Sequence, residues 1–288
     1  MSGDRKVTIV EVGPRDGLQN EKGIVPTADK LNLIRLLADA GLSRIEVTAF
    51  VSPKWVPQMA DHDAVMRQAP RSARLVRSVL VPNEKGAEAA IAAGADELAV
   101  FTSASESFAS KNVNCTIAES MQRFIAVVRI AKAHGLPVRG YVSCAVDCPY
   151  EGAIAPGAVA AVSSALRDLG CYEIALADTI GRGSPDRVDL MLQHVLERIP
   201  ASMLACHFHD TSKRALENVD VALMRKITTF DSSAGGLGGC PYAPGAAGNV
   251  ATGAIVSHLH KCGYSTGIDP VGLLIAEDFA LGLRATAR

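Results

Sequence analysis

Two histidines separated by one residue, His207-Phe-His209, end an apolar run of the chain. Residues two apart in a β-strand point to the same face, so both imidazoles would project together from one strand end. Neutral imidazole is a common metal ligand, and a pair of hydrogen-bonded histidines in a polar strand end is the alternative. Cys206 and Asp210 would point to the opposite face of the strand from the two histidines. This disfavours a zinc site built from cysteine and histidine unless the strand bulges.

Two oxygen donors complete a candidate metal site. Asp16 and Asn249 would supply a carboxylate oxygen and an amide oxygen beside the two histidines. Oxygen ligands favour Mg²⁺ or Mn²⁺ over Zn²⁺, although the nitrogen ligands leave other divalent ions open. Asp-Gly is also a common turn pair, so a turn-forming role is the competing interpretation of Asp16.

Arg15 would place a fixed cation next to this group. A guanidinium in that position can stabilise the oxygen of a developing enolate. The other interpretation is a salt bridge with Glu46, which lies inside an apolar strand candidate and would be costly to bury without a partner. The two roles are compatible with each other.

The segment Gly236–Asn249 contains five glycines and two prolines in 14 residues, a composition that predicts a shaped loop. Its Cys240 has three interpretations: a buried small residue, a metal ligand or an acid/base group. A thiol with a pKa near ~8.5 can donate a proton at neutral pH, and a glycine-rich loop is a poor core. Cys144 and Cys148, spaced as Cys-x-x-x-Cys, are interpreted as mainly structural.

Eight short β-branched runs alternate with longer helical patterns along the chain, which predicts an α/β fold of the (β/α)8 TIM-barrel type with an additional C-terminal helix. The strand candidates are Val7–Val12, Arg44–Phe50, Arg74–Val81, Glu97–Ser103, Val138–Ala145, Tyr172–Asp178, Met203–His209 and Thr228–Ser233. Helices are expected over Thr27–Gly41, with Thr27 as its candidate cap, and over Asn83–Gly94 and Thr116–Gly135. Further helices are expected from near Pro156, Pro185, Arg214 and Asn249, and within Pro270–Ala287.

No composition break divides the chain, so residues 1–288 are predicted to form a single catalytic domain. The alternative fold is a doubly wound open sheet, but no G-x-G-x-x-G or P-loop motif follows the first strand. In a TIM barrel, functional groups gather at the carboxyl ends of the strands. The polar stretch Ser103–Asn114 is expected to be a loop on that rim, either contacting substrate or simply solvated.

The composition excludes several classes of partner. The chain has 29 basic and 30 acidic residues and no polybasic run, so we expect neither nucleic acid nor a membrane surface as partner. No stretch reaches the ~18 apolar residues of a membrane span, and the N-terminal residues lack the pattern of a signal or transit peptide. Seven cysteines in 288 residues fit a reducing compartment, and we expect a soluble cytoplasmic protein.

Taken together, these residues resemble those of the 3-hydroxy-3-methylglutaryl-CoA lyases, a family within a superfamily of metal-dependent lyases and aldol-type TIM-barrel enzymes. The matching segments span nearly the whole chain. They are Val12–Lys22, Ile45–Met59, Lys111–Cys115, Arg139–Gly152, Asp178–Gly181, His207–Thr211 and Gly236–Thr252. Phe-Val-Ser-Pro-Lys-Trp-Val-Pro-Gln and Gly-Leu-Gly-Gly-Cys-Pro-Tyr-Ala are the most specific of the motifs.

The resemblance implies three sets of site residues. The ligands of a divalent cation, Mg²⁺ or Mn²⁺, would be Asp16, His207, His209 and Asn249. The catalytic residues would be Arg15, Asp16, Glu46 and Cys240. The substrate contacts would be Arg15, Gln19 and Thr179. Cys240 would lie on a mobile catalytic loop whose other end, at Asn249, is held at the metal.

The resemblance also implies the reaction, a retro-Claisen cleavage of an acyl-CoA substrate. (S)-3-Hydroxy-3-methylglutaryl-CoA would be cleaved to acetyl-CoA and acetoacetate, as a step of leucine catabolism. The enzyme would be a homodimer. A related acyl-CoA lyase, a 2-oxo-acid condensing enzyme or aldolase, and a non-catalytic CoA-binding protein are the alternatives. The chain departs from the usual family pattern at Ala177, at Ser212–Arg214 and at Gly253, where the family often has Gly, Tyr-Gly-Gln and Glu. None of these departures removes a predicted ligand.

Overall fold

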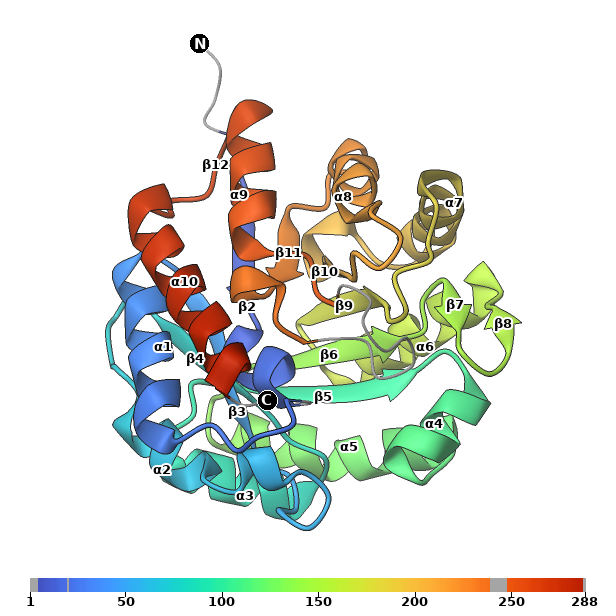
Figure 1. The fold of residues 1–288 in the computed structure, drawn as a ribbon. Helices are drawn as coiled ribbons and strands as arrows, with labels where there is room; N and C mark the ends of the chain where they lie inside the picture. The colour runs from blue at the N-terminus through green and yellow to red at the C-terminus, as the bar shows by residue number, and fades with distance from the viewer. Residues whose placement is uncertain (1–4, 20, 239–247, 287–288) are drawn as a thin grey trace.

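A closed parallel β-barrel forms the centre of the molecule (Figure 1). The computed structural model describes residues 5–19, 21–238 and 248–286. The barrel strands are β2 (Thr8–Glu11), β3 (Arg44–Ala49), β4 (Val76–Leu80), β5 (Glu97–Ser103), β6 (Val138–Ser143), β9 (Glu173–Asp178), β10 (Leu204–Phe208) and β11 (Thr229–Ser232). They close in the order β10-β11-β2-β3-β4-β5-β6-β9. The predicted strands and the predicted TIM barrel are therefore confirmed.

Helices surround the barrel on its outside (Figure 1). They are α1 (Thr27–Asp39), α2 (His62–Gln68), α3 (Glu84–Ala93), α4 (Glu106–Val113), α5 (Ile117–Ala133), α6 (Pro156–Leu169), α7 (Pro185–Leu196), α8 (Ala215–Met224), α9 (Thr252–Lys261) and α10 (Pro270–Thr286). Short turns of helix are η1 (Gly13–Gly17), η2 (Pro57–Met59), η3 (Ala201–Met203) and η4 (Ala234–Gly236). Two pairs of short strands lie outside the barrel, β1 (Arg5–Lys6) with β12 (Tyr264–Ser265) and β7 (Asp147–Cys148) with β8 (Gly152–Ala153).

Local sequence signals explain where several helices begin and end. Asn83 caps α3 by accepting a hydrogen bond from the backbone of Gly86, and Gly94 ends that helix in the left-handed conformation. Thr116 and Glu119 form a complete capping box at the start of α5. One continuous hydrophobic cluster, which includes Val7 near the start of the chain and Leu283 in α10, packs the helices against the strands.

Three local predictions were wrong. The polar stretch after β5 is not a loop, because Ser105 caps a helix there, α4, by accepting a hydrogen bond from the backbone of Phe108. Thr27 is not a helix cap: it lies inside α1, and its hydroxyl donates to Asp61 at 2.7 Å. The helix expected from near Asn249 begins only at Thr252.

The additional C-terminal helix is present. α10 packs against α1 and α9 on the outside of the barrel (Figure 1). None of the described helices combines the length and the apolar character needed to cross a membrane.

Candidate active site

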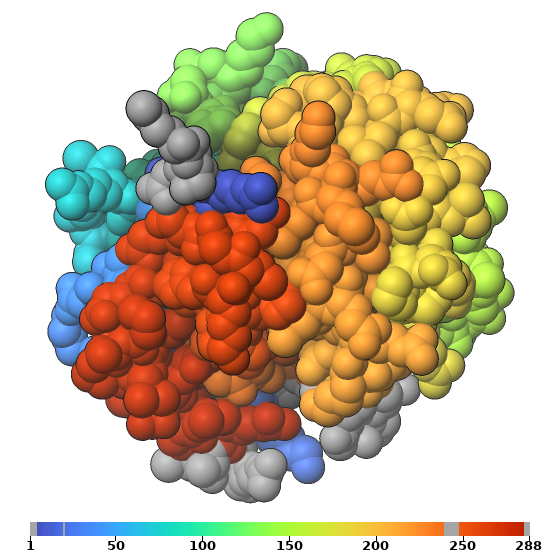
Figure 2. All heavy atoms as spheres, turned by 90° about the horizontal axis from the view of Figure 1, so that it is seen from above, coloured from blue at the N-terminus to red at the C-terminus, as the bar shows by residue number. Residues whose placement is uncertain are grey.

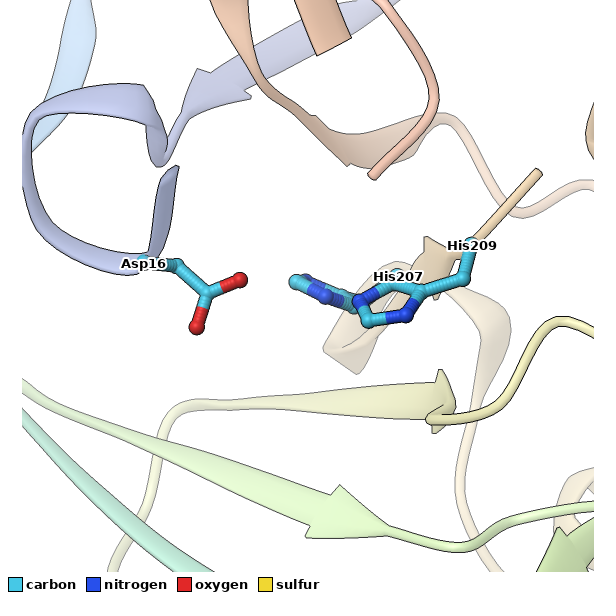
Figure 3. A group of neighbouring side chains, drawn as sticks. All are labelled: Asp16, His207 and His209. Carbon is cyan, nitrogen blue, oxygen red and sulfur yellow. The ribbon is translucent and has the colours of Figure 1, made fainter. Parts of the chain in front are cut away.

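Asp16, His207 and His209 converge at the carboxyl ends of the barrel strands (Figure 3). One donor atom from each of the three side chains lies within 4.8 Å of the others, a spacing that suits a single metal ion. The two histidines come from the end of β10, and the carboxylate of Asp16 points toward both rings from the turn after β2. The period of a strand predicted the pairing of the two histidines, and the rule that barrel chemistry lies at strand ends predicted Asp16 beside them.

A single turn of π-helix, η1, positions Asp16. The backbone N–H groups of Asp16 and Gly17 both donate to the carbonyl of Val12, at 2.7 and 3.1 Å. A side chain at Gly17 would meet Leu237 at 2.8 Å, so this turn approaches the following loop too closely for any residue but glycine. Asp16 is therefore held by a tight backbone turn rather than by a strand.

The orientation of His207 is set by Asp231, a residue that the sequence reasoning missed. The Nδ1 atom of His207 lies 3.1 Å from a carboxylate oxygen of Asp231, and the Arg139 guanidinium contacts both oxygens of that carboxylate, at 2.7 and 3.1 Å. Burial would raise the pKa of Asp231, but Arg139 and His207 hold it well below its usual range. Since the ionised carboxylate only accepts hydrogen bonds, Nδ1 carries the proton and Nε2 keeps its lone pair for a metal ion.

His209 is held in its neutral form. Burial and the neighbouring His207 lower the pKa of His209 to about 4, against the opposing effects of Asp16 and of a backbone hydrogen bond with Thr179. The ring centroids of the two histidines are 5.3 Å apart. Near neutral pH, this imidazole therefore has a lone pair available for ligation.

Asp16 is ionised over the whole neutral range. Burial would raise its pKa, but Arg15, His207 and His209, together with a hydrogen bond from Asn249, lower it to about 2. The side-chain N–H₂ of Asn249 donates to Asp16 at 2.8 Å and to the carbonyl of Leu237 at 3.2 Å. The amide oxygen of Asn249 is thus left as the atom that can join the metal ligands.

Arg15 forms the salt bridge expected from the sequence. Its Nε donates to Glu46 at 2.5 Å, its Nη1 donates to Asp16 at 2.7 Å, and its guanidinium lies over the ring of Tyr141, 5.9 Å from the centroid. Burial opposes the charged form of Arg15, but the two carboxylates raise the pKa of Arg15 well above its usual range. Burial also raises the pKa of Glu46, and its second carboxylate oxygen has no hydrogen-bond partner among the described residues.

A cavity of about 270 Å³ opens above these side chains. Gln19 and Thr179, the predicted substrate contacts, both line it, together with Arg15 and the three clustered ligands. The Thr179 hydroxyl accepts a hydrogen bond from the backbone of Cys144 at 2.7 Å. Asn112 of α4 lines the cavity as well, and the sequence reasoning did not single it out.

Two buried carboxylates hold the backbone around the site. Glu11 accepts hydrogen bonds from the N–H groups of Gly13 and Ala234 at 2.7 and 2.9 Å, and from the hydroxyl of Thr252 at 2.6 Å. Glu277 of α10 accepts from the N–H groups of Gly235 and Gly253 at 3.0 and 2.8 Å. The two carboxylates therefore connect η1, η4 and α9 around the ligand-bearing turns.

The structure also locates the departures from the family pattern. A side chain at position 253 would meet the Glu277 carboxylate at 2.2 Å, so Glu277 occupies the space beside Gly253. Ala177 lines the cavity, whereas none of Ser212–Arg214 is among the described residues that do. Cys240, with the rest of 239–247, lies outside the described residues.

The comparisons with known proteins agree with one another. The family model HMGL-like matches residues 6–279. A cytoplasmic 3-hydroxy-3-methylglutaryl-CoA lyase of Danio rerio is 55% identical over 95% of this chain and 82% of its own length, and a mitochondrial hydroxymethylglutaryl-CoA lyase of Rattus norvegicus is 54% identical over 96% and 85%. The crystal structure of the HMG-CoA lyase from Brucella melitensis superposes with a TM-score of 0.96 at 56% identity, covering 98% of this chain and 99% of that one.

Proposed function

The chain belongs to the HMGL-like family, and from that membership and the geometry of its site we infer that it is a carbon–carbon lyase that cleaves (S)-3-hydroxy-3-methylglutaryl-CoA to acetyl-CoA and acetoacetate. The observation that carries this conclusion is the convergence of Asp16, His207 and His209 beside the buried cation Arg15 in one cavity. A cleavage that generates an enolate uses both a site for a divalent cation and a fixed positive charge.

The donor set fits a divalent cation. Asp16, His207, His209 and Asn249 would hold it, and we propose Mg²⁺ or Mn²⁺ because half of these donors are oxygens. A divalent ion bound there would lower the pKa of the substrate's C3 hydroxyl. Asp231 supports the fit, because it presents the lone pair of His207 to the cavity.

The reaction needs a proton acceptor near the C3 hydroxyl. Asp16, or a histidine acting through water, takes the hydroxyl proton. The C2–C3 bond then breaks, C3 becomes the ketone carbon of acetoacetate, and the bonding electrons pass to the thioester as an enolate. Asp16 enters this step as a carboxylate at every pH near neutrality, since its pKa lies at about 2.

Arg15 stabilises the enolate oxygen, and Glu46 positions Arg15. The guanidinium is charged at every working pH, so its contribution needs no proton transfer. Gln19 and Thr179 orient the acyl group from the cavity wall. Removing one electrostatic donor of this kind costs about 10²–10³ in kcat, which sets the expected effect of Arg15→Met.

Cys240 donates the proton that converts the enolate to acetyl-CoA, a role proposed from the sequence alone. A Cys240→Ser variant is expected to lose most of its kcat while keeping its affinity for the divalent ion. Full turnover in that variant would remove Cys240 from the mechanism.

The decisive experiment measures acetoacetate release from 3-hydroxy-3-methylglutaryl-CoA with and without EDTA. We expect cleavage that EDTA abolishes and that Mg²⁺ or Mn²⁺ restores. Parallel assays with pyruvate-derived aldols test the alternative of a 2-oxo-acid aldolase. Turnover of those aldols in preference to the thioester would overturn the assignment, and no turnover of either substrate class would indicate a non-catalytic CoA-binding protein.

The cellular setting belongs to the same proposal. A lyase with this substrate acts in leucine catabolism, and we place it in the cytoplasm, where the seven cysteines of the chain would stay reduced. Relatives are named both cytoplasmic and mitochondrial, so fractionation of the source cells is the test.

A further inference from the structure

A second group of metal-ligating side chains lies between α8 and α9, away from the cavity. Asp220 projects from α8, and His258 and Cys262 come from the last turn and the C-cap of α9. One donor atom from each lies within 4.8 Å of the others. None of the three lines the catalytic cavity. We propose that Asp220, His258 and Cys262 form a zinc site that joins α8 to α9.

The spacing on α9 creates the site. His258 and Cys262 are four residues apart, so they lie one above the other on the same helical face. That face meets α8: the Nε2 atom of His258 lies 2.7 Å from Asp220 and 3.9 Å from the sulfur of Cys262. His260 and Lys261 line a separate cavity against α10, so their side chains do not occupy the space between the three ligands.

The donor chemistry favours zinc. A nitrogen, a sulfur and a carboxylate oxygen together make the borderline-soft set that Zn²⁺ prefers. Ligand atoms at ordinary zinc distances in a tetrahedral site lie about 3.3–3.6 Å apart. The observed separations of 2.7 and 3.9 Å from His258 Nε2 reach those values by side-chain movements of under about 1 Å.

The surroundings favour a cation and leave it accessible. The site lies at the carboxyl end of α9, where the helix dipole is negative. Side-chain exposure is 23% for His258 and 48% for Asp220, so the ion has an entry path and water can complete the fourth position. On binding, Cys262 releases its thiol proton to solvent. The proton on Nε2 of His258, which faces Asp220, moves to Nδ1 of the same ring by exchange with water, so that Nε2 and the Asp220 carboxylate both bind the ion. The bound carboxylate and thiolate then balance the charge of the ion.

The position gives the ion a structural role. α8 follows β10 and the two histidines at its end, His207 and His209, and α9 begins three residues after Asn249. Figure 2 shows the orange part of the chain, which includes α8, bordering the orange-red part that includes α9 at the surface. An ion between α8 and α9 therefore links two segments that follow the catalytic ligands. The ion itself does not contact the substrate.

The test counts zinc on the full chain after EDTA treatment, reloading with Zn²⁺ and gel filtration. We expect the natural chain to retain one more equivalent than Cys262→Ser. Loss of one ligand is expected to weaken zinc binding at this site by at least about 100-fold. The matched control His260→Gln, two residues away on a different face, should keep the extra equivalent.

A spectroscopic readout identifies the sulfur ligand. Cobalt substitution should give a thiolate-to-cobalt charge-transfer band that persists in Cys240→Ser and disappears in Cys262→Ser and His258→Gln. Cys262→Ser should retain full Mg²⁺-dependent cleavage, because Cys262 has no part in catalysis. Equal zinc content in the natural chain and Cys262→Ser, or a band that survives in Cys262→Ser, would overturn the proposal while leaving the lyase assignment untouched.

Discussion

At the residue scale, Asp231 determines which nitrogen of His207 faces the cavity. It is itself held by Arg139, which also donates to Glu173 at 2.7 Å and to the hydroxyl of Tyr141 at 2.6 Å. Arg139 is only 1% exposed and Asp231 2% exposed, so each charge depends on the other for stability. The proposed metal site therefore rests on a buried ionic network that extends into the barrel interior.

This network makes Asp231→Asn a sharp test. The amide has the shape of the carboxylate but no charge, so His207 loses its ionised partner and Arg139 loses one of its two carboxylate partners, keeping Glu173. We expect affinity for Mn²⁺ to fall by about 10–100-fold and the free energy of unfolding to fall by about 3–5 kcal/mol. Titration calorimetry and urea unfolding measure the two effects. The surface variant Asp63→Asn, which removes only an exposed ion pair with Arg67, should change neither. Unchanged Mn²⁺ affinity in Asp231→Asn would show that His207 does not need this partner.

Sequence reasoning reached the three clustered ligands but not the residue that orients one of them. His207 and His209 followed from the period of a strand, and Asp16 followed from the rule that barrel chemistry lies at strand ends. Asp231 is an acid in a short strand with threonine, phenylalanine and serine around it, and its partner Arg139 is 92 residues away in the chain. Only the closed barrel brings the two together, so their pairing was not predictable from local pattern.

At the element scale, the buried carboxylates of Glu11 and Glu277 position the turns that carry the ligands. Burial raises the pKa of Glu11 to about 7, and the nearby charge of Glu277 raises it by a smaller amount. The hydrogen bonds that Glu11 accepts from Thr252, Ala234 and Gly13 act in the opposite direction and lower it. The folded state therefore binds more protons at Glu11 than the unfolded chain between the ordinary pKa of 4.5 and about 7. The stabilising contribution of this group is present at low pH and is lost as the pH rises through that window.

Glu11→Gln tests this linkage. The amide keeps the geometry of the hydrogen bonds without a charge, so the variant should match the natural chain within about 1 kcal/mol at pH 5 and exceed its stability by about 3 kcal/mol at pH 8. Urea unfolding of the metal-free proteins at the two pH values measures the difference. The control Glu88→Gln, at an exposed position, should differ from the natural chain by the same free energy of unfolding at both pH values. A gap of the same size at both pH values would contradict the raised pKa.

Gly253 and Glu277 should be energetically coupled. Gly253→Ala places a methyl group 2.2 Å from the Glu277 carboxylate, which must then withdraw from two backbone N–H groups. We expect a loss of about 1–3 kcal/mol, which disappears in the background of Glu277→Ala. Thermal unfolding of the natural chain, the two single variants and the double variant gives the coupling free energy between the two positions. Gly157→Ala, at the start of α6 with open space around it, is the matched control. Additive effects would exclude the coupling.

Element positions were more predictable than element ends. All eight barrel strands were found because buried parallel strands form short β-branched runs. α4 was missed because eight residues of mixed polarity, Glu-Ser-Phe-Ala-Ser-Lys-Asn-Val, have no clear helical stripe. Its start depends on the cap at Ser105, a signal that competes with the turn preference of the same residue. The helix after Asn249 begins late because Asn249 and Ala251 are bridged to His209 and Ser233.

At the scale of the whole molecule, α10 presents an apolar stripe to solvent. Val271, Leu274 and Ile275, spaced as i, i+3 and i+4, are 68%, 59% and 55% exposed. From this stripe we propose that the protein forms the homodimer that the family resemblance implies. Light scattering should give the dimer mass, and Leu274→Glu should shift it to the monomer. Met224→Glu, at a 74% exposed position of α8, should remain dimeric. A natural chain that is monomeric at micromolar concentration would refute the dimer.

The proposed metal ligands lie on both sides of the point at which the barrel closes. Asp16 follows β2, the first barrel strand of the chain, whereas His207 and His209 lie in and directly after β10, and Asn249 follows β11. β2 pairs with β11 only when the ring closes. A chain emerging from the ribosome therefore carries only one of the four proposed ligands, Asp16, for most of its synthesis and cannot yet hold an ion. Ion binding thus reports completion of the ring, and protection by Mn²⁺ against proteolysis should appear only in nascent chains whose β11 has been released.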